Sequence, residues 1–131
     1  MKTKLLLILP TLFLLISCGS GLTGTWNIDR YEIVRENGQN TSAENIGVIS
    51  FQKNGKGTKN IHYNIFDNEY EDKSSFTYEV NKEKASVTIK GEKGDESSFN
   101  KTWIMIEDKG KKQIWKSTDG ANIVQTIELS K

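Results

Sequence analysis

The sequence predicts an all-β domain of about eight strands, arranged as a meander that closes on itself or stacks as two sheets. The first observation is composition. Residues 18–131 contain 12 Ile, 5 Val and 9 Thr but only 2 Leu and 3 Ala. β-Branched residues lose rotamer freedom in helices and pack well in sheets, whereas Leu and Ala favour helices. The second is that short alternating apolar stretches are separated by turn-forming residues at regular intervals.

Residues 1–17 are predicted to be a signal peptide and not part of the fold. Two lysines precede an almost unbroken apolar run, Leu5 to Ile16. As a helix this run reaches about 18 Å, short of the ~30 Å hydrocarbon layer of a bilayer. It ends in Leu-Ile-Ser-Cys, which resembles the lipobox of bacterial lipoproteins. The resemblance implies cleavage before Cys18 and lipid attachment to its sulfur.

Cys18 is the only cysteine of the chain. At about 0.8 kcal/mol per buried methylene, two or three acyl chains, such as palmitate, would anchor the protein permanently. The next residue is Gly19, not Asp, which by analogy with bacterial sorting signals predicts the outer membrane, with the domain facing the periplasm. Residues 18–22 are then the lipidated Cys and a short linker, and residues 23–131 form one domain.

Composition argues against several chemistries. One Cys and one His cannot build a zinc site or a disulfide framework. A net charge of +1 gives no basic surface for nucleic acid. The carboxylate pairs Glu71-Asp72 and Asp95-Glu96 are expected in solvated turns, and no GxSxG motif is present. We therefore expect a monomer that is not an enzyme and needs no metal or cofactor.

The first predicted strand contains Trp26 and Ile28, after which the apolar phase slips to Tyr31 and Ile33. This slip predicts a β-bulge near residues 29–30. The polar stretch Asn37–Gly47 follows and is expected to be a short helical or irregular loop.

The later strands are bounded by turn residues. Asn54-Gly55 is expected to form a type I′ hairpin turn. The strands expected around it and beyond are 48–51, 61–65, 76–80, 85–89, 99–106, 114–115 and 123–129.

Two short motifs resemble those of a known family. Residues 22–28, with Gly24-Thr25-Trp26, resemble the GxW start of lipocalins, and Phe51 with Gly55 and Gly57 is similar to an F-x-x-x-G-x-G hairpin of small lipocalin-like lipoproteins common in Bacteroidetes-type bacteria. The resemblance implies an eight-stranded up-and-down antiparallel β-barrel. Gly24 and Trp26 would close one end, and a ligand cavity would open at the other. Lipocalins pack a late Arg on this Trp, but no Arg follows Arg35 here.

Five residues are expected to line the ligand cavity: Phe76, Tyr78, Phe99, Trp103 and Met105. The alternative is that the same side chains fill the core. Lys101, Arg30 and Arg35 are candidate partners for a ligand carboxylate, although a surface position is favoured for Lys101. His62 is expected to point outward.

The resulting functional hypothesis is a membrane-anchored lipocalin-like lipoprotein that binds a small apolar ligand. The alternative is a non-enzymatic envelope interaction protein, or a hydrolase inhibitor, with a filled barrel.

Overall fold

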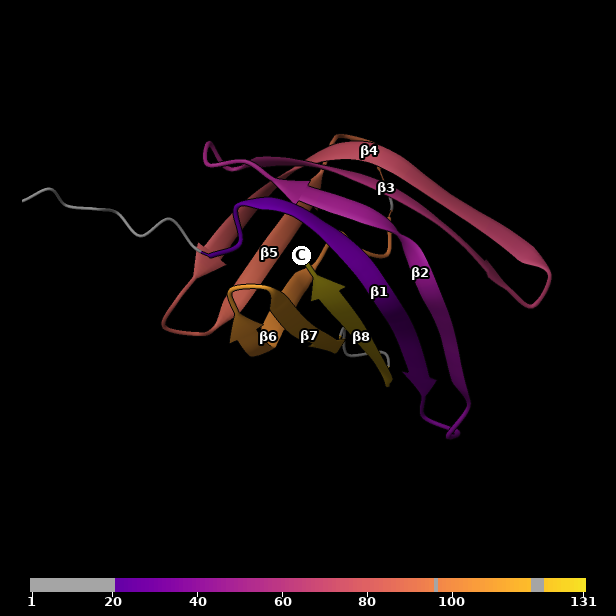
Figure 1. Cartoon of the computed structure of the whole chain (residues 1–131). Coiled ribbons are helices and arrows are strands. Elements are labelled where there is room, and N and C mark those ends of the chain that lie inside the picture. The colour runs from indigo at the N-terminus through magenta and orange to yellow at the C-terminus, as the bar shows by residue number, and fades with distance from the viewer. Residues whose placement is uncertain (1–20, 96, 119–121) are drawn as a thin grey trace, which may run out of the picture.

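The computed structural model describes residues 21–95, 97–118 and 122–131. Eight strands pair in sequential order into a closed antiparallel barrel, and the described residues contain no helix (Figure 1). The strands are β1 (Gly24–Arg35), β2 (Asn40–Phe51), β3 (Lys56–Ile65), β4 (Asn68–Asn81), β5 (Ser86–Gly91), β6 (Thr102–Lys109), β7 (Lys112–Thr118) and β8 (Ile123–Ser130). Within these residues there is accordingly no helix of the length and apolarity that crossing a bilayer requires.

β1 closes the barrel by pairing with both β2 and β8. The predicted bulge is confirmed, because the register of both pairings shifts between Ile28 and Arg30. The extra residue lets side chains on both sides of the bulge point inward, so that Trp26, Ile28 and Tyr31 are all buried.

The expected helical or irregular loop at Asn37–Gly47 is wrong. β2 begins at Asn40, and residues 36–39 form a tight turn. Gly47 explains one irregularity of this strand, because it has a φ of 139° and a Cβ there would collide with the backbone oxygen of Asn60 on β3. The polar start of β2 pairs with the second half of β1, from Arg30↔Glu44 to Val34↔Asn40. This pairing satisfies backbone groups of β1 that would otherwise lack a hydrogen-bond partner on this side.

The turn at Asn54-Gly55 is a hairpin as predicted, but it is not type I′. Only Gly55 has a positive φ, of 82°, and the side-chain oxygen of Asn54 accepts a hydrogen bond from the backbone N–H of Lys56 at 3.0 Å. The positive φ angles of a two-residue type I′ turn occur instead at Phe66 (51°) and Asp67 (62°), between β3 and β4.

The barrel has two unlike ends. The closed end holds the start of β1 with Trp26, together with the β2–β3, β4–β5 and β6–β7 turns. The open end holds the turns after β1 and β3 and the long segment between β5 and β6. In Figure 1 β1 begins at the left and the β3–β4 hairpin projects at the right. Aromatic rings fill the closed half: Phe51 lies 5.5 Å from Phe76 and 5.8 Å from Trp115 between ring centroids.

Candidate ligand-binding site

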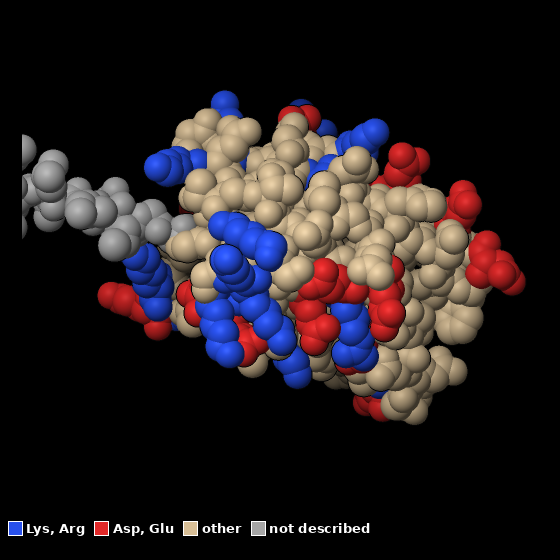
Figure 2. Space-filling view, in the orientation of Figure 1, with Lys and Arg blue, Asp and Glu red and all other residues tan. Residues whose placement is uncertain are grey.

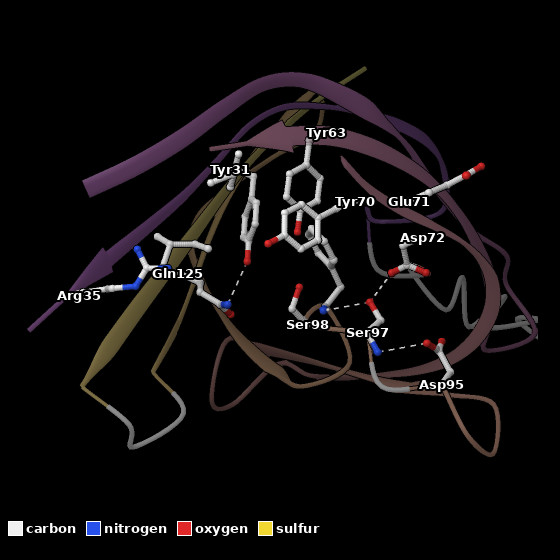
Figure 3. Close-up of a pocket in the computed structure, with 13 residues that line it drawn as sticks. Tyr31, Arg35, Tyr63, Tyr70, Glu71, Asp72, Asp95, Ser97, Ser98 and Gln125 are labelled. Atoms are coloured by element: carbon white, nitrogen blue, oxygen red, sulfur yellow. Dashed lines mark hydrogen bonds between the residues drawn. The ribbon is translucent and has the colours of Figure 1, made fainter. Parts of the chain in front are cut away.

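A cavity of about 520 Å³ occupies the open end of the barrel (Figure 3). It is opposite Trp26, because its lining comes from the last residues of β1 and β3, the first half of β4 and the start of β8. The β5–β6 segment forms a further wall. The lining residues are Tyr31, Ile33, Arg35, Tyr63, Ile65, Tyr70, Glu71, Asp72, Asp95, Ser97, Ser98, Phe99 and Gln125.

Four aromatic rings form one side of the cavity. Tyr31 lies 5.0 Å from Phe99 and 5.5 Å from Tyr63, measured between ring centroids. Tyr63 in turn stacks on Tyr70 at 5.0 Å with an interplanar angle of 15°. Tyr31 and Phe99 are buried at the base, whereas Tyr70 is 45% exposed towards the entrance. These rings give an apolar surface with hydroxyl groups at its edges.

The alternation of the strands explains this lining. On β3 the residues Ile61, Tyr63 and Ile65 share the inner face, and on β4 that face continues through Tyr70 and Asp72. Ile61 is fully buried below the cavity, so the apolar core ends where these tyrosines begin.

A buried lysine organises the polar wall. The ammonium of Lys59, on β3, lies 2.9 Å from Asp72 and 3.3 Å from Asp95, and donates to the Asn100 side-chain oxygen at 3.1 Å. Its side chain is 0% exposed, whereas those of Asp72 and Asp95 are 18% and 20% exposed. Ser74 donates to both carboxylates, at 3.0 and 3.2 Å. Removing a charged member of such a buried network costs about 3–5 kcal/mol.

The same network fixes the segment between β5 and β6. Asp95 and Asn100 reach Lys59 from this segment, and Ser97 donates its hydroxyl to Asp72. The segment packs closely over the end of β5, because a Cβ at Gly91 would overlap the Asn100 amide and approach an Asp95 oxygen to 2.7 Å. One wall of the cavity is therefore a loop held in place by buried ion pairs.

Two pKa shifts define the protonation states of this wall. Burial raises the pKa of Asp95, but hydrogen bonds from Asn100 and Ser97 and the charge of Lys59 lower it more, so its net pKa lies below the usual value. Burial raises the pKa of the Tyr63 hydroxyl above 10.0, although a hydrogen bond with Ser98 opposes the shift. At neutral pH the carboxylate is ionised and the phenol is neutral.

The opposite side of the cavity holds Arg35 and Gln125 (Figure 3). Gln125 is buried and donates to the Tyr31 hydroxyl at 2.9 Å. Its side-chain oxygen accepts a hydrogen bond from Lys101, whose ammonium is 5.8 Å from the Trp103 ring centre. The half-buried Lys101 therefore contacts interior groups but is not among the residues that line the cavity.

Of the five residues predicted to line the cavity, the structure places Phe99 there. Trp103 is fully buried behind it, with its indole N–H donating to the Phe99 carbonyl at 3.0 Å. Phe76 and Tyr78 join the aromatic cluster of the closed half, and Met105 packs against the core. His62 is exposed, as predicted.

Sequence reasoning missed the three cavity tyrosines and both aspartates. Asp72 lies within β4 and not in a turn, and Asp95 contacts a buried ammonium. The available signal was Lys59, which is two residues before Ile61 on the inner face of β3. An inward Lys requires carboxylates near it.

The start of β1, with Trp26, lies at the closed end of the barrel. Trp26 is fully buried, and its indole N–H donates to the Leu22 carbonyl at 2.7 Å. The cation that packs on its ring, at 4.6 Å from the centre, is Lys131, which also donates to the Thr23 carbonyl at 2.7 Å. Gly24 has a φ of 124°, and a Cβ there would contact the Lys131 ammonium at 3.0 Å. Lysine thus occupies the position for which no arginine was found.

The F-x-x-x-G-x-G motif also has a physical basis. Gly55 provides the positive φ of the hairpin turn. A Cβ at Gly57 would overlap the ring of Phe76 and approach the Ser50 backbone oxygen to 2.5 Å.

Comparison with known proteins agrees with this geometry. Residues 22–104 match the family model described as a lipocalin-like domain. The chain belongs to this lipocalin-like family. The matched residues of the lipocalin-like domain include Trp26 and most of the cavity wall, while β7 and β8, which complete the barrel, follow them. No curated protein matches the chain significantly.

Two solved structures are similar to this lipocalin-like chain. One is a redesigned β-barrel, with 17% sequence identity, a TM-score of 0.45, and coverage of 87% of this chain and 96% of the other. The second is Japanin from Rhipicephalus appendiculatus bound to cholesterol, with 10% identity, a TM-score of 0.49, and coverage of 86% and 77% respectively.

Proposed function

We propose that this lipocalin-like protein is a lipid-anchored binding protein that holds a small hydrophobic ligand in the cavity at its open end. The observation that supports binding is the cavity of about 520 Å³ bordered by four aromatic rings. Ligand pockets typically measure about 300–1,000 Å³ and combine apolar walls with a few fixed polar groups. The barrel is filled by side chains in its closed half only, which favours a ligand-binding role over that of a solid scaffold.

The anchor is proposed from the sequence. Cys18 lies outside the described residues, six residues before β1 begins at Gly24. A lipid there would hold the closed end towards the bilayer and direct the cavity to the aqueous side. Eight lysines lie at the closed end, in or next to its turns and at Lys131. The eight are Lys53, Lys56, Lys82, Lys84, Lys109, Lys111, Lys112 and Lys131. Three acidic residues, Glu83, Glu107 and Asp108, lie among these lysines. Each Lys near an anionic surface adds about 1 kcal/mol of attraction. With Gly19 after the Cys, we further propose the outer membrane as the location.

The test combines Cys18→Ser with replacement of residues 1–17 by a secretory signal peptide that is cleaved without lipid attachment. This Cys18→Ser chain should leave the detergent phase of a phase-separation assay, whereas the native chain should stay in it. On the released protein, the uncharged apolar dye Nile red should bind and fluoresce. Ser98→Trp should weaken binding of the dye at least about ten-fold, because Ser98 lines the cavity and an indole there would take up space that the dye needs (Figure 3).

Asn60→Trp is the matched control, because Asn60 is exposed on the outside of β3. Equal dye binding by both Trp variants would contradict the cavity as the binding site. A Cys18→Ser protein that remains in the detergent phase would contradict the anchor.

A further inference from the structure

Building on this proposed binding function, we propose that the cavity selects hydrophobic ligands that have a protonated amine, and that Asp72 and Asp95 receive the ammonium group. The inference names the ligand class of the cavity from the charges that its wall presents.

The first step is that the polar wall exposes carboxylates to the cavity, whereas its own cation, Lys59, is buried. Lys59 donates to, or pairs with, three acceptors: Asp72, Asp95 and Asn100. An ammonium has three N–H groups, so these contacts use its full donor capacity. Since its side chain is fully buried while the two carboxylates remain about one-fifth exposed, a ligand in the cavity meets oxygen atoms and not the Lys59 nitrogen.

The second step is charge balance among the described residues. Two carboxylates share one ammonium, which leaves one unit of negative charge at this wall. The other charged lining residues, Arg35 and Glu71, have opposite signs. The remaining hydrogen bonds to Asp72 and Asp95 come from neutral hydroxyl, side-chain amide and backbone groups and do not change the balance. A monovalent cation would neutralise the wall.

The third step is that aromatic rings stand beside these oxygens. In Figure 3 the rings of Tyr63 and Tyr70 lie next to Ser98, with Tyr31 on one side of them and Asp72 on the other. Tyr63 also packs against Tyr31, but Tyr70 is 45% exposed, so the face of the Tyr70 ring that does not stack on Tyr63 is open to a ligand. Aromatic faces attract cations by about 0.5–2 kcal/mol, whereas they do not attract carboxylates.

The charged side chains around the open end give an electrostatic field of the same negative sign as the cavity wall. Residues 66–72 of the β3–β4 hairpin include Asp67, Glu69, Glu71 and Asp72 and no basic residue. Figure 2 shows acidic side chains bordering the end where this hairpin lies, and several basic side chains nearer the end where β1 begins. Such a field raises the local concentration of cations at the entrance.

A fatty-acid carboxylate fits this cavity less well. Arg35 is its available partner, at the last position of β1 and across the cavity from Asp72 and Asp95. The guanidinium is already 3.5 Å from the Thr41 hydroxyl. A carboxylate placed deeper would face the two aspartates.

The experiment compares decylamine, decanol and decanoate at pH 7 by displacement of Nile red from the Cys18→Ser chain. The amine is protonated at this pH, and the three probes have the same hydrocarbon tail. We expect decylamine to bind about ten-fold more tightly than decanol, and decanol more tightly than decanoate. Decanol or decanoate binding as tightly as decylamine would overturn the inference while leaving the binding function intact. If no probe displaces the dye and Nile red itself does not bind, the proposed function fails first.

A charge variant locates the selectivity. Asp95→Asn should reduce the preference for decylamine over decanol to less than about three-fold, because one carboxylate then balances Lys59. Glu69→Gln removes the same charge from an exposed position of the β3–β4 hairpin that does not line the cavity, and should retain the preference. An equal loss in both variants would mean that the general field, and not contact with the aspartates, causes the selectivity. The comparison of decylamine, decanol and decanoate on the Cys18→Ser chain, whose cavity wall is unchanged, decides the inference even if Asp95→Asn folds poorly.

Discussion

At the scale of single residues, the packing of Lys131 on Trp26 joins the last described residue to the first strand. The ammonium lies 4.6 Å from the ring centre and also donates to the Thr23 carbonyl. Both contacts need a cation with N–H donors, a requirement that lysine and arginine share.

We predict that Lys131→Ala lowers the free energy of unfolding by about 1 kcal/mol, through loss of the cation–π contact and one hydrogen bond. Lys131→Arg should retain most of the stability. Urea unfolding followed by tryptophan fluorescence measures both variants, and Lys53→Ala, an exposed lysine in the β2–β3 turn, is the control. A Lys131→Ala protein as stable as the control would show that Trp26 is held by its neighbours without this cation.

Lys59 shows why a site can escape prediction at this scale. Its charge suggested nothing about burial, and the two aspartates that satisfy it are 13 and 36 residues further along the chain. Strand alternation places Lys59 on the inner face, but the β5–β6 segment that brings Asp95 has no regular period. The ion pairs depend on a tertiary contact that local patterns do not encode.

At the scale of elements, the β2–β3 hairpin combines a turn and a packing requirement two residues apart. Gly55 supplies the left-handed backbone of the turn, and Gly57 leaves space for the Phe76 ring from β4. The hairpin therefore sets how closely β4 packs on the core.

Gly57→Ala should destabilise the protein by about 2 kcal/mol, because the methyl group would overlap the Phe76 ring and crowd a backbone oxygen. Thermal unfolding by circular dichroism provides the measurement. Gly110→Ala is matched to it, since a Cβ at Gly110 meets no atom within 4 Å. Equal melting temperatures for the two variants would mean that the Phe76 ring moves aside without loss of stability.

Strand positions were predictable where one face is apolar and the other polar. Trp26, Ile28 and the bulge after them followed from period-two alternation. Residues 40–47 did not, because the open end of the barrel is lined by polar as well as apolar groups and the inner face of β2 there loses its apolar signature. The eight-strand count survived this error because β2 extends a strand that was already expected at 48–51.

At the scale of the whole molecule, ionisation of Asp95 couples the cavity wall to global stability. Its pKa is lower in the folded chain than its usual value of 3.8. Between the folded and unfolded pKa values the unfolded chain binds more protons, so this group stabilises the fold above about pH 4 and loses that effect as the pH falls further.

Wild-type stability should therefore fall below about pH 4 more steeply than that of Asp95→Asn, which has no proton to take up at this position. Urea titrations at several pH values between neutral and acid conditions measure the difference. Asp67→Asn, which removes a carboxylate in the exposed β3–β4 turn outside the Lys59 network, serves for comparison. Parallel profiles for wild type and Asp95→Asn would contradict the coupling.

Closure of the barrel was the feature that depended least on local sequence patterns. The up-and-down meander left open whether the strands curl or stack, and the short motifs around Trp26 and Gly57 favoured a barrel by family resemblance alone. The pairing of β1 with β8 decides it, with contacts from Asn27↔Ser130 to Arg35↔Ile123.

The buried ion pairs of Lys59 would also restrict how the proposed binding site can evolve. Asp95 gives the pocket its charge and, through the same two oxygens, holds the loop that shapes it. A single substitution that alters ligand preference there would also loosen the wall. New specificities should accordingly arise first at the entrance, around Arg35 and Tyr70, where a side chain can change without disturbing the scaffold.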